Sequence, residues 1–172
     1  MRQVLISDTS VLIDLGRCNC LTAAFRLPEV SFAVPEILYA RELEDSEGPT
    51  LRALGLQIVA LSSGELALAS SYQERVKTIS LPDSSALALA RQRQLTLLTG
   101  DGPLRELARV EGVPIHGVLW LLDELERHAV VTATELLHGL SALKAHPRCR
   151  LPQSSVNERL ARWRLAIKIG GE

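Results

Sequence analysis

The sequence predicts an α/β protein: a three-layer α/β/α domain with a mostly parallel central sheet, followed by a helical extension. Two observations carry this prediction. Short apolar stretches alternate with helical patterns over the first two thirds of the chain, and from residue 117 onward the pattern is helical only. Alternating strands and helices are typical of a parallel sheet. The predicted strands cover residues 3–7, 57–61, 95–99 and 113–116.

Length and composition agree with one globular domain and its extension. The chain has 172 residues, of which 47% are hydrophobic and 23% charged, values near globular averages that exclude disordered and collagen-like classes. Aromatic residues make up 3%, so Leu, Ala, Val and Ile must build the core. The net charge of -1 excludes an overall electrostatic attraction to nucleic acid but leaves local patches open.

The segments between the predicted strands contain residues that are typical of helix starts and helix ends. Pro35 suits the first turn of a helix that ends before Gly48 and Pro49. A second helix opens at Asp83, in a cluster of Asp and Ser residues that suits an N-cap. A third runs from Gly102 to Gly112 and buries a leucine-rich face.

We predict a core domain over residues 1–128 and a helical C-terminal extension over residues 129–172. The chain after Gly117 reads as three helical segments, "VLWLLDELERH", "TATELLHGLSALKAH" and "NERLARWRLAI", and we expect the first to complete the core domain. The N-terminus shows no charged leader, and no apolar run approaches the roughly 18 residues of a membrane span. We therefore expect a cytoplasmic protein with no membrane partner.

Acidic residues follow the predicted strands. Asp8 comes directly after residues 3–7 and stands between two apolar runs, where an unpaired carboxylate is costly. Asp101 follows the strand at 95–99, and Asp83 opens the helix that leads back to that strand. In parallel sheets ligands bind at the carboxyl ends of the strands, so we expect these three side chains to meet.

Glu42 is the fourth candidate, one helical turn after Leu38 and directed inward if Leu38 faces the sheet. Converging carboxylates repel one another unless a cation neutralises them, and oxygen ligands suit Mg²⁺ or Mn²⁺. Such an ion would support phosphodiester hydrolysis. We therefore predict metal binding by Asp8, Asp83 and Asp101, and a catalytic set that adds Glu42.

The segments "LISDTSVLIDL", "ELED", "LPDSSALALARQRQLTLLTGDGPLREL" and "VPIHGVLWLL" together resemble a PIN domain, the fold of many VapC-type toxin ribonucleases, over about residues 2–125. The acids at positions 8, 42, 83 and 101 match the acidic positions of that family. Ser10 and Thr99 match its hydroxyl positions and are expected to support the acids. Glu36, Glu44 and Asp45 lie close to Glu42 and leave open which acid completes the site.

The resemblance implies a metal-dependent endoribonuclease that hydrolyses RNA, a toxin or toxin-like protein with an antitoxin partner, and a homodimer. The C-terminal extension of this chain is longer than that of compact toxin members of the family. The competing hypothesis is a non-catalytic PIN-like module that binds RNA or protein. A phosphatase of the haloacid dehalogenase type fits less well, because Ser10 occupies the position of its general acid.

Single acids also have ordinary structural explanations, since Asp8, Asp83 and Asp101 could each cap a helix or stabilise a turn. The C-terminal region is locally basic, with seven Lys or Arg residues from Lys144 to Lys168 against one acid, Glu158. This bias favours equally a solvated basic helix and an electrostatic arm that binds RNA or an acidic partner segment. The candidate RNA-binding residues are Arg105, Lys144, Arg148 and Arg150. For Arg105, a surface or ion-pairing role is the main interpretation and a phosphate contact is the alternative.

Overall fold

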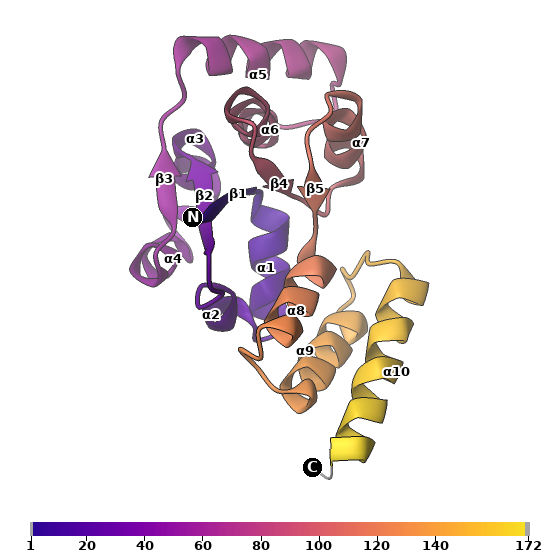
Figure 1. Ribbon diagram of the computed structural model, residues 1–172. Coiled ribbons are helices and arrows are strands. Elements are labelled where there is room, and N and C mark those ends of the chain that lie inside the picture. The colour runs from indigo at the N-terminus through magenta and orange to yellow at the C-terminus, as the bar shows by residue number, and fades with distance from the viewer. Residues whose placement is uncertain (1, 171–172) are drawn as a thin grey trace.

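The computed structural model describes residues 2–170, with a five-stranded sheet at its centre (Figure 1). The strand order is β3-β2-β1-β4-β5, and all four pairings are parallel. The strands are β1 (Gln3–Ser7), β2 (Val30–Pro35), β3 (Gln57–Val59), β4 (Thr96–Leu98) and β5 (Ile115–His116). Met1 and residues 171–172, the outer ends of the two predicted domains, lie outside the described residues.

Helices cover both faces of the sheet, which confirms the predicted three-layer class (Figure 1). One layer holds α3 (Glu36–Leu38), α5 (Ser63–Arg75), α6 (Leu81–Arg93) and α7 (Gly102–Val110). The other holds α1 (Thr9–Arg17), α2 (Leu21–Ala24) and α8 (Val118–Arg127), while a π-helix η1 (Tyr39–Leu43) and α4 (Gly48–Leu54) precede β3. No helix in the described part of the chain is long and apolar enough to cross a bilayer.

Strand β2, which lies beside β1 in the middle of the sheet, was not predicted from the sequence. A strand buried on both faces appears as a short continuous apolar run without alternation, and this run continues directly into the next helix. Pro35 is therefore the last residue of β2 and the N-cap of α3, not a residue of a first helical turn. The predicted strands at 57–61 and 95–99 end earlier, at Val59 and Leu98.

One predicted helix boundary was wrong, and one short helix was missed. The helix expected to open at Asp83 begins at Leu81 and is capped by Ser80, whose hydroxyl accepts a hydrogen bond from the Asp83 N–H at 3.1 Å. Asp83 therefore lies within the first turn of α6 rather than at its cap. The helix that follows Pro35 ends before Gly48 and Pro49, as predicted, at Leu43 of η1. The short helix α4, which begins at Gly48 and Pro49, was not predicted, although proline fits the first turn of a helix.

The C-terminal helices α9 (Ala133–Ala145) and α10 (Gln153–Gly170) pack against each other and against the rest of the molecule. α9 approaches α1 so closely that a Cβ atom at Gly139 would lie 2.4 Å from the Cys18 carbonyl oxygen. Trp163 of α10 is fully buried. The predicted domain boundary after residue 128 falls in the turn between α8 and α9, and it stays a prediction.

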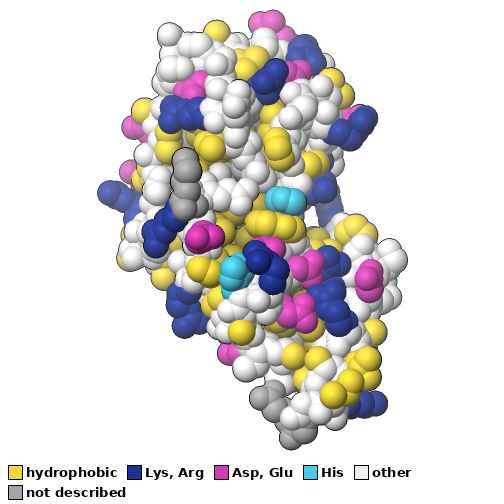
Figure 2. Space-filling view, viewed as in Figure 1, with side chains coloured by type: hydrophobic (Ala, Val, Ile, Leu, Met, Phe, Trp, Pro, Cys, Tyr) yellow, Lys and Arg dark blue, Asp and Glu magenta, His cyan; other side chains and the backbone are white. Residues whose placement is uncertain are grey.

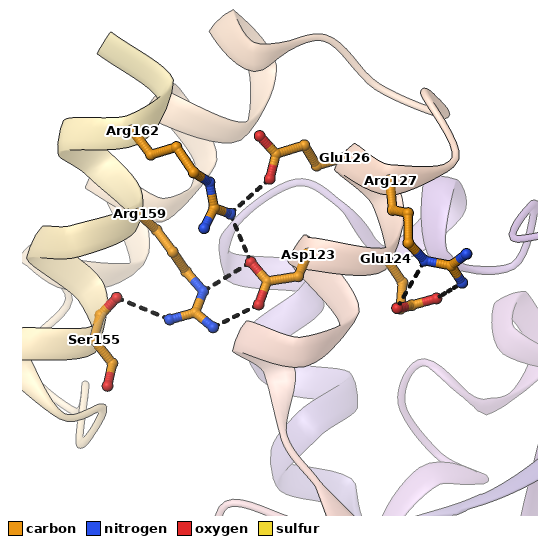
Figure 3. A network of polar contacts seen from close by, with 7 residues as sticks. All are labelled: Asp123, Glu124, Glu126, Arg127, Ser155, Arg159 and Arg162. Atoms are coloured by element: carbon orange, nitrogen blue, oxygen red, sulfur yellow. Dashed lines mark hydrogen bonds and ion pairs between the residues drawn. The ribbon is translucent and has the colours of Figure 1, made fainter. Parts of the chain in front are cut away.

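An ion-pair network, which we call the α8–α10 latch, joins α8 to α10 (Figure 3). Asp123 accepts two hydrogen bonds from Arg159, at 2.9 and 2.5 Å, and a third from Arg162 at 2.8 Å. Arg162 also donates to Glu126 at 2.6 Å. Acidic and basic side chains accordingly lie side by side over this junction in the space-filling view (Figure 2).

Candidate active site

The carboxyl ends of β1 and β4 form the centre of the candidate site. Ser7 pairs with Leu98 in the parallel register, and the Asp8 N–H donates to the Leu98 carbonyl at 3.0 Å. Asp8 therefore stands beside Thr99, each one residue past its strand. The chain moves from β1 toward β2 and β3 on one side, and from β4 toward β5 on the other. Such a reversal point opens the crevice in which open α/β sheets bind ligands.

Asp8 is almost fully buried, with 2% of its surface exposed. One carboxylate oxygen accepts hydrogen bonds from the Ser10 hydroxyl at 2.7 Å and the Val11 N–H at 3.1 Å. The other accepts from the Thr99 hydroxyl at 2.5 Å. Burial raises the pKa of Asp8 to about 6, although these hydrogen bonds act in the opposite direction. Asp8 caps α1 and also belongs to the acidic site, so the two interpretations are compatible.

The loop after β4 is tied to Asp8 through hydroxyl groups. The buried Thr99 hydroxyl accepts from the Asp101 N–H at 3.0 Å, and Ser10 accepts from the Gly100 N–H at 3.2 Å. Asp101 caps α7 with one carboxylate oxygen, which accepts from the Leu104 N–H at 2.9 Å. Ser10 and Thr99 thus fix Asp8 relative to the Asp101 loop.

The pKa of Asp83 is affected by the charges of other acids at the site. Burial is the main cause of the raised pKa of Asp83, and the charges of Glu42 and Asp101 raise it further, against the lowering effect of a hydrogen bond with Ser80. The charge of Asp83 in turn contributes to the raised pKa of Asp8. Like charges shift each other in this way only at short range. The charges of Glu42 and Asp101 therefore act on Asp83, and the charge of Asp83 acts on Asp8, which places the four predicted acids in one electrostatic neighbourhood.

Glu42 belongs to the π-helix η1, a local irregularity that is often found at functional sites. Its side chain is exposed and accepts a hydrogen bond from the Thr9 hydroxyl. This link to the residue after Asp8 distinguishes Glu42 from Glu36, Glu44 and Asp45. The sequence analysis did not identify Thr9, and its position directly after Asp8 was the one available signal.

The four carboxylates have no cationic partner: no ion pair among residues 2–170 includes Asp8, Glu42, Asp83 or Asp101. Three of them stand at the positive N-terminal ends of α1, α6 and α7, which offset part of their repulsion. An all-oxygen, anionic donor set fits a hard divalent cation.

The geometry also limits how such an ion could be held. Within the described chain, no three His, Cys, Asp or Glu side chains are placed to enclose a metal ion as they stand. Mg²⁺ usually retains several waters and is held by one or two carboxylates. The donor set therefore fits an ion that takes part of its coordination shell from water or substrate oxygens.

The predicted RNA-binding residues are placed differently. Arg148 and Arg150 line a cavity of about 400 Å³ beside Ser10 and Asp101. Arg105 donates to the Thr99 carbonyl at 2.8 Å, so it steadies the loop after β4. Lys144 instead bonds the Asn157 side chain at 2.8 Å and does not line this cavity.

The comparisons with known proteins agree with this geometry. A family model described as a PIN domain matches residues 4–164, and the chain belongs to the PIN-domain family, whose members are generally nucleases. Among solved structures, the fold is similar to a PilT N-terminus domain protein from the hyperthermophilic archaeon Sulfolobus solfataricus P2. That match has a TM-score of 0.51 at 14% identity and covers 72% of this chain and 95% of the other. The curated proteins contain no match.

Proposed function

We propose that this PIN-domain protein is a metal-dependent endoribonuclease that hydrolyses phosphodiester bonds of RNA. Asp8, Asp83 and Asp101 are the proposed ligands of Mg²⁺ or Mn²⁺, and Glu42 completes the catalytic set. One observation carries the proposal: four carboxylates from four separate segments influence one another's charge around the reversal point between β1 and β4, and none of them forms an ion pair within residues 2–170. Family membership and the donor chemistry support it.

The chain's own residues orient the Asp8 carboxylate and supply an acceptor for a proton from water. A bound divalent cation would polarise the phosphate and lower the pKa of a coordinated water. Ser10 and Thr99 hold the carboxylate of Asp8 in one orientation. Glu42 is exposed and positioned by Thr9 through one oxygen, so its other oxygen is proposed to accept a proton from the attacking water.

The test is cleavage of a structured RNA mixture with Mg²⁺, with Mn²⁺ and with EDTA. Asp8→Asn should reduce metal-dependent cleavage on the order of a thousandfold, as expected when a group that stabilises the transition state is lost. Asp45→Asn is the matched control because it removes an exposed acid close to Glu42 in sequence. It should leave the rate unchanged.

Two outcomes would contradict the proposal. Equal cleavage by Asp8→Asn would remove Asp8 from the mechanism. Folded protein free of bound inhibitor that cleaves nothing with either metal would favour the non-catalytic module that binds RNA or protein.

The resemblance also supports narrower proposals. We propose a cytoplasmic toxin or toxin-like protein, restrained by an antitoxin that covers the acidic edge, and a homodimer. Light scattering of the purified chain tests the dimer. Co-purification of an inhibitory protein that is released together with cleavage activity tests the antitoxin.

A further inference from the structure

Two cavities lie between the acidic site and the C-terminal extension, and they share part of their lining. The first, about 400 Å³, reaches Ser10 and Asp101. The second, about 390 Å³, reaches His116 and Trp120. Both are lined by Asp14, Gly100, Arg150 and Leu151. They therefore form one groove, the extension groove, which runs from Asp101 to Trp120.

The extension groove contains arginines of two kinds. Arg17 pairs with Asp14 at 3.3 Å, and Arg159 belongs to the α8–α10 latch. Arg148 and Arg150 are exposed, and neither guanidinium forms a hydrogen bond or ion pair with any other residue of 2–170. Arginine binds phosphate through a planar fork of N–H donors. Two such groups next to a phosphodiesterase site are therefore available to an anionic ligand.

The segment that carries these arginines is held in place at both ends. It connects α9 to α10, and α9 is packed against α1 at Gly139. At the other end, Arg159 donates to the Ser155 carbonyl at 3.0 Å while it bonds Asp123 (Figure 3). The latch thereby fixes the start of α10 against α8. The arginines are presented by a positioned segment of the extension.

The far end of the groove is aromatic. The rings of His116 and Trp120 stack, with centroids 4.1 Å apart and an angle of 6° between their planes. Both residues are half-buried and line the cavity. Aromatic side chains combined with a cationic groove are the usual means of binding single-stranded nucleic acid, because bases stack on the rings while cations follow the backbone.

We propose that the extension groove binds the single-stranded RNA segment adjoining the cleavage site. Arg148 and Arg150 contact backbone phosphates of this segment, and the His116–Trp120 pair receives a base. This inference rests on the proposed ribonuclease function and adds to it the substrate class and the role of the C-terminal extension.

The test is the affinity of the full chain for a fluorescently labelled single-stranded oligoribonucleotide, measured by anisotropy in EDTA at several salt concentrations. The variant is Arg148→Ala with Arg150→Ala. Its control is Arg164→Ala with Lys168→Ala, which removes the same charge from exposed positions of α10 outside the groove. Each phosphate contact on a single strand contributes about 0.7 to the slope of log affinity against log salt.

The groove variant should bind more weakly and reduce the magnitude of that slope by about 1.4, for two contacts of this size, while the control keeps the slope of the unmodified protein. Equal slopes for both variants would overturn the proposal. So would failure of the unmodified chain to bind the oligonucleotide.

Trp120→Leu tests the aromatic end. Loss of a stacked base should weaken single-strand binding roughly fivefold or more, and should weaken binding of a duplex of the same length much less. A circular dichroism spectrum like that of the unmodified chain shows that the variant is folded. An equal loss for single strand and duplex would contradict the assignment of a base to Trp120.

The binding and cleavage assays separate the two proposals. Because the binding assay contains no metal, it can support the groove even if cleavage is never observed, and the ribonuclease proposal then fails alone. If the Arg148→Ala, Arg150→Ala variant binds RNA normally and keeps metal-dependent cleavage, the proposal for the extension groove fails and the ribonuclease proposal stands.

Discussion

The acidic edge, which carries Asp8, Glu42, Asp83 and Asp101, and the α8–α10 latch place an aspartate side chain in opposite surroundings. At the edge, Asp8 is buried, receives only uncharged hydrogen-bond donors, and lies under the influence of another carboxylate. At the latch, Asp123 is 31% exposed and pairs with two arginines. One region collects negative charge without neutralising it, whereas the other neutralises it with nearby cations.

This difference separates the structural carboxylate of the latch from the carboxylates proposed to be functional. The chain contains arginines near the edge, yet Arg105 bonds a backbone carbonyl there and Arg17 pairs with Asp14. Ionised acids left without a cation oppose folding. The proposed metal ion would supply the missing positive charge at the edge, whereas the latch needs no such ligand.

The largest expected effect is on stability at the edge. In EDTA at pH 7.5, Asp8→Asn should raise the free energy of unfolding by up to about 3 kcal/mol, because the pKa of Asp8 is about 6 when folded and 3.8 as its ordinary value. Asparagine keeps the N-cap of α1. Chemical denaturation measures the change. A loss of stability in this variant would show that Asp8 has a mainly structural role.

The same comparison predicts a pH dependence. The folded state holds the Asp8 proton more tightly than the unfolded state, so the destabilisation is complete above pH 6 and fades as the pH falls toward 3.8. The stability difference between Asp8→Asn and the unmodified protein should therefore shrink over that interval. Denaturation curves at pH 7.5, 6, 5 and 4 measure it. A difference that stays constant would exclude Asp8 ionisation as its cause.

The smallest expected effect is at the latch and has the opposite sign. Asp123→Asn should lower the free energy of unfolding by about 1 kcal/mol, since partly exposed ion pairs contribute little individually. Denaturation at pH 7.5 compares it with the identical change at Asp8. If both variants shift stability in the same direction, the contrast between the two regions fails.

Much of the fold and site could be predicted from local patterns. Strand ends followed by Asp8 and by Asp101 indicated the sheet edge, where the charges of Asp83 and Glu42 also act. The strand β2 was missed because its apolar run has no period that separates it from the helix that follows. Local patterns of this kind do not show where an element ends.

The surroundings of the site were less predictable for a different reason. Arg148 and Arg150 reach the acidic edge only because the latch and the packing of α9 fold the extension back. Lys144 belongs to the same basic stretch of sequence but bonds Asn157 instead. Such long-range placement depends on tertiary contacts, which a local sequence pattern does not contain.

Calorimetric titration of Mn²⁺ into the unmodified protein, Asp8→Asn and Asp123→Asn tests the central claim most directly. We expect saturable binding to the unmodified protein and equal binding to Asp123→Asn, with binding lost in Asp8→Asn. Absence of binding to the unmodified protein, or undiminished binding to Asp8→Asn, would contradict the assignment of the acidic edge as a metal site.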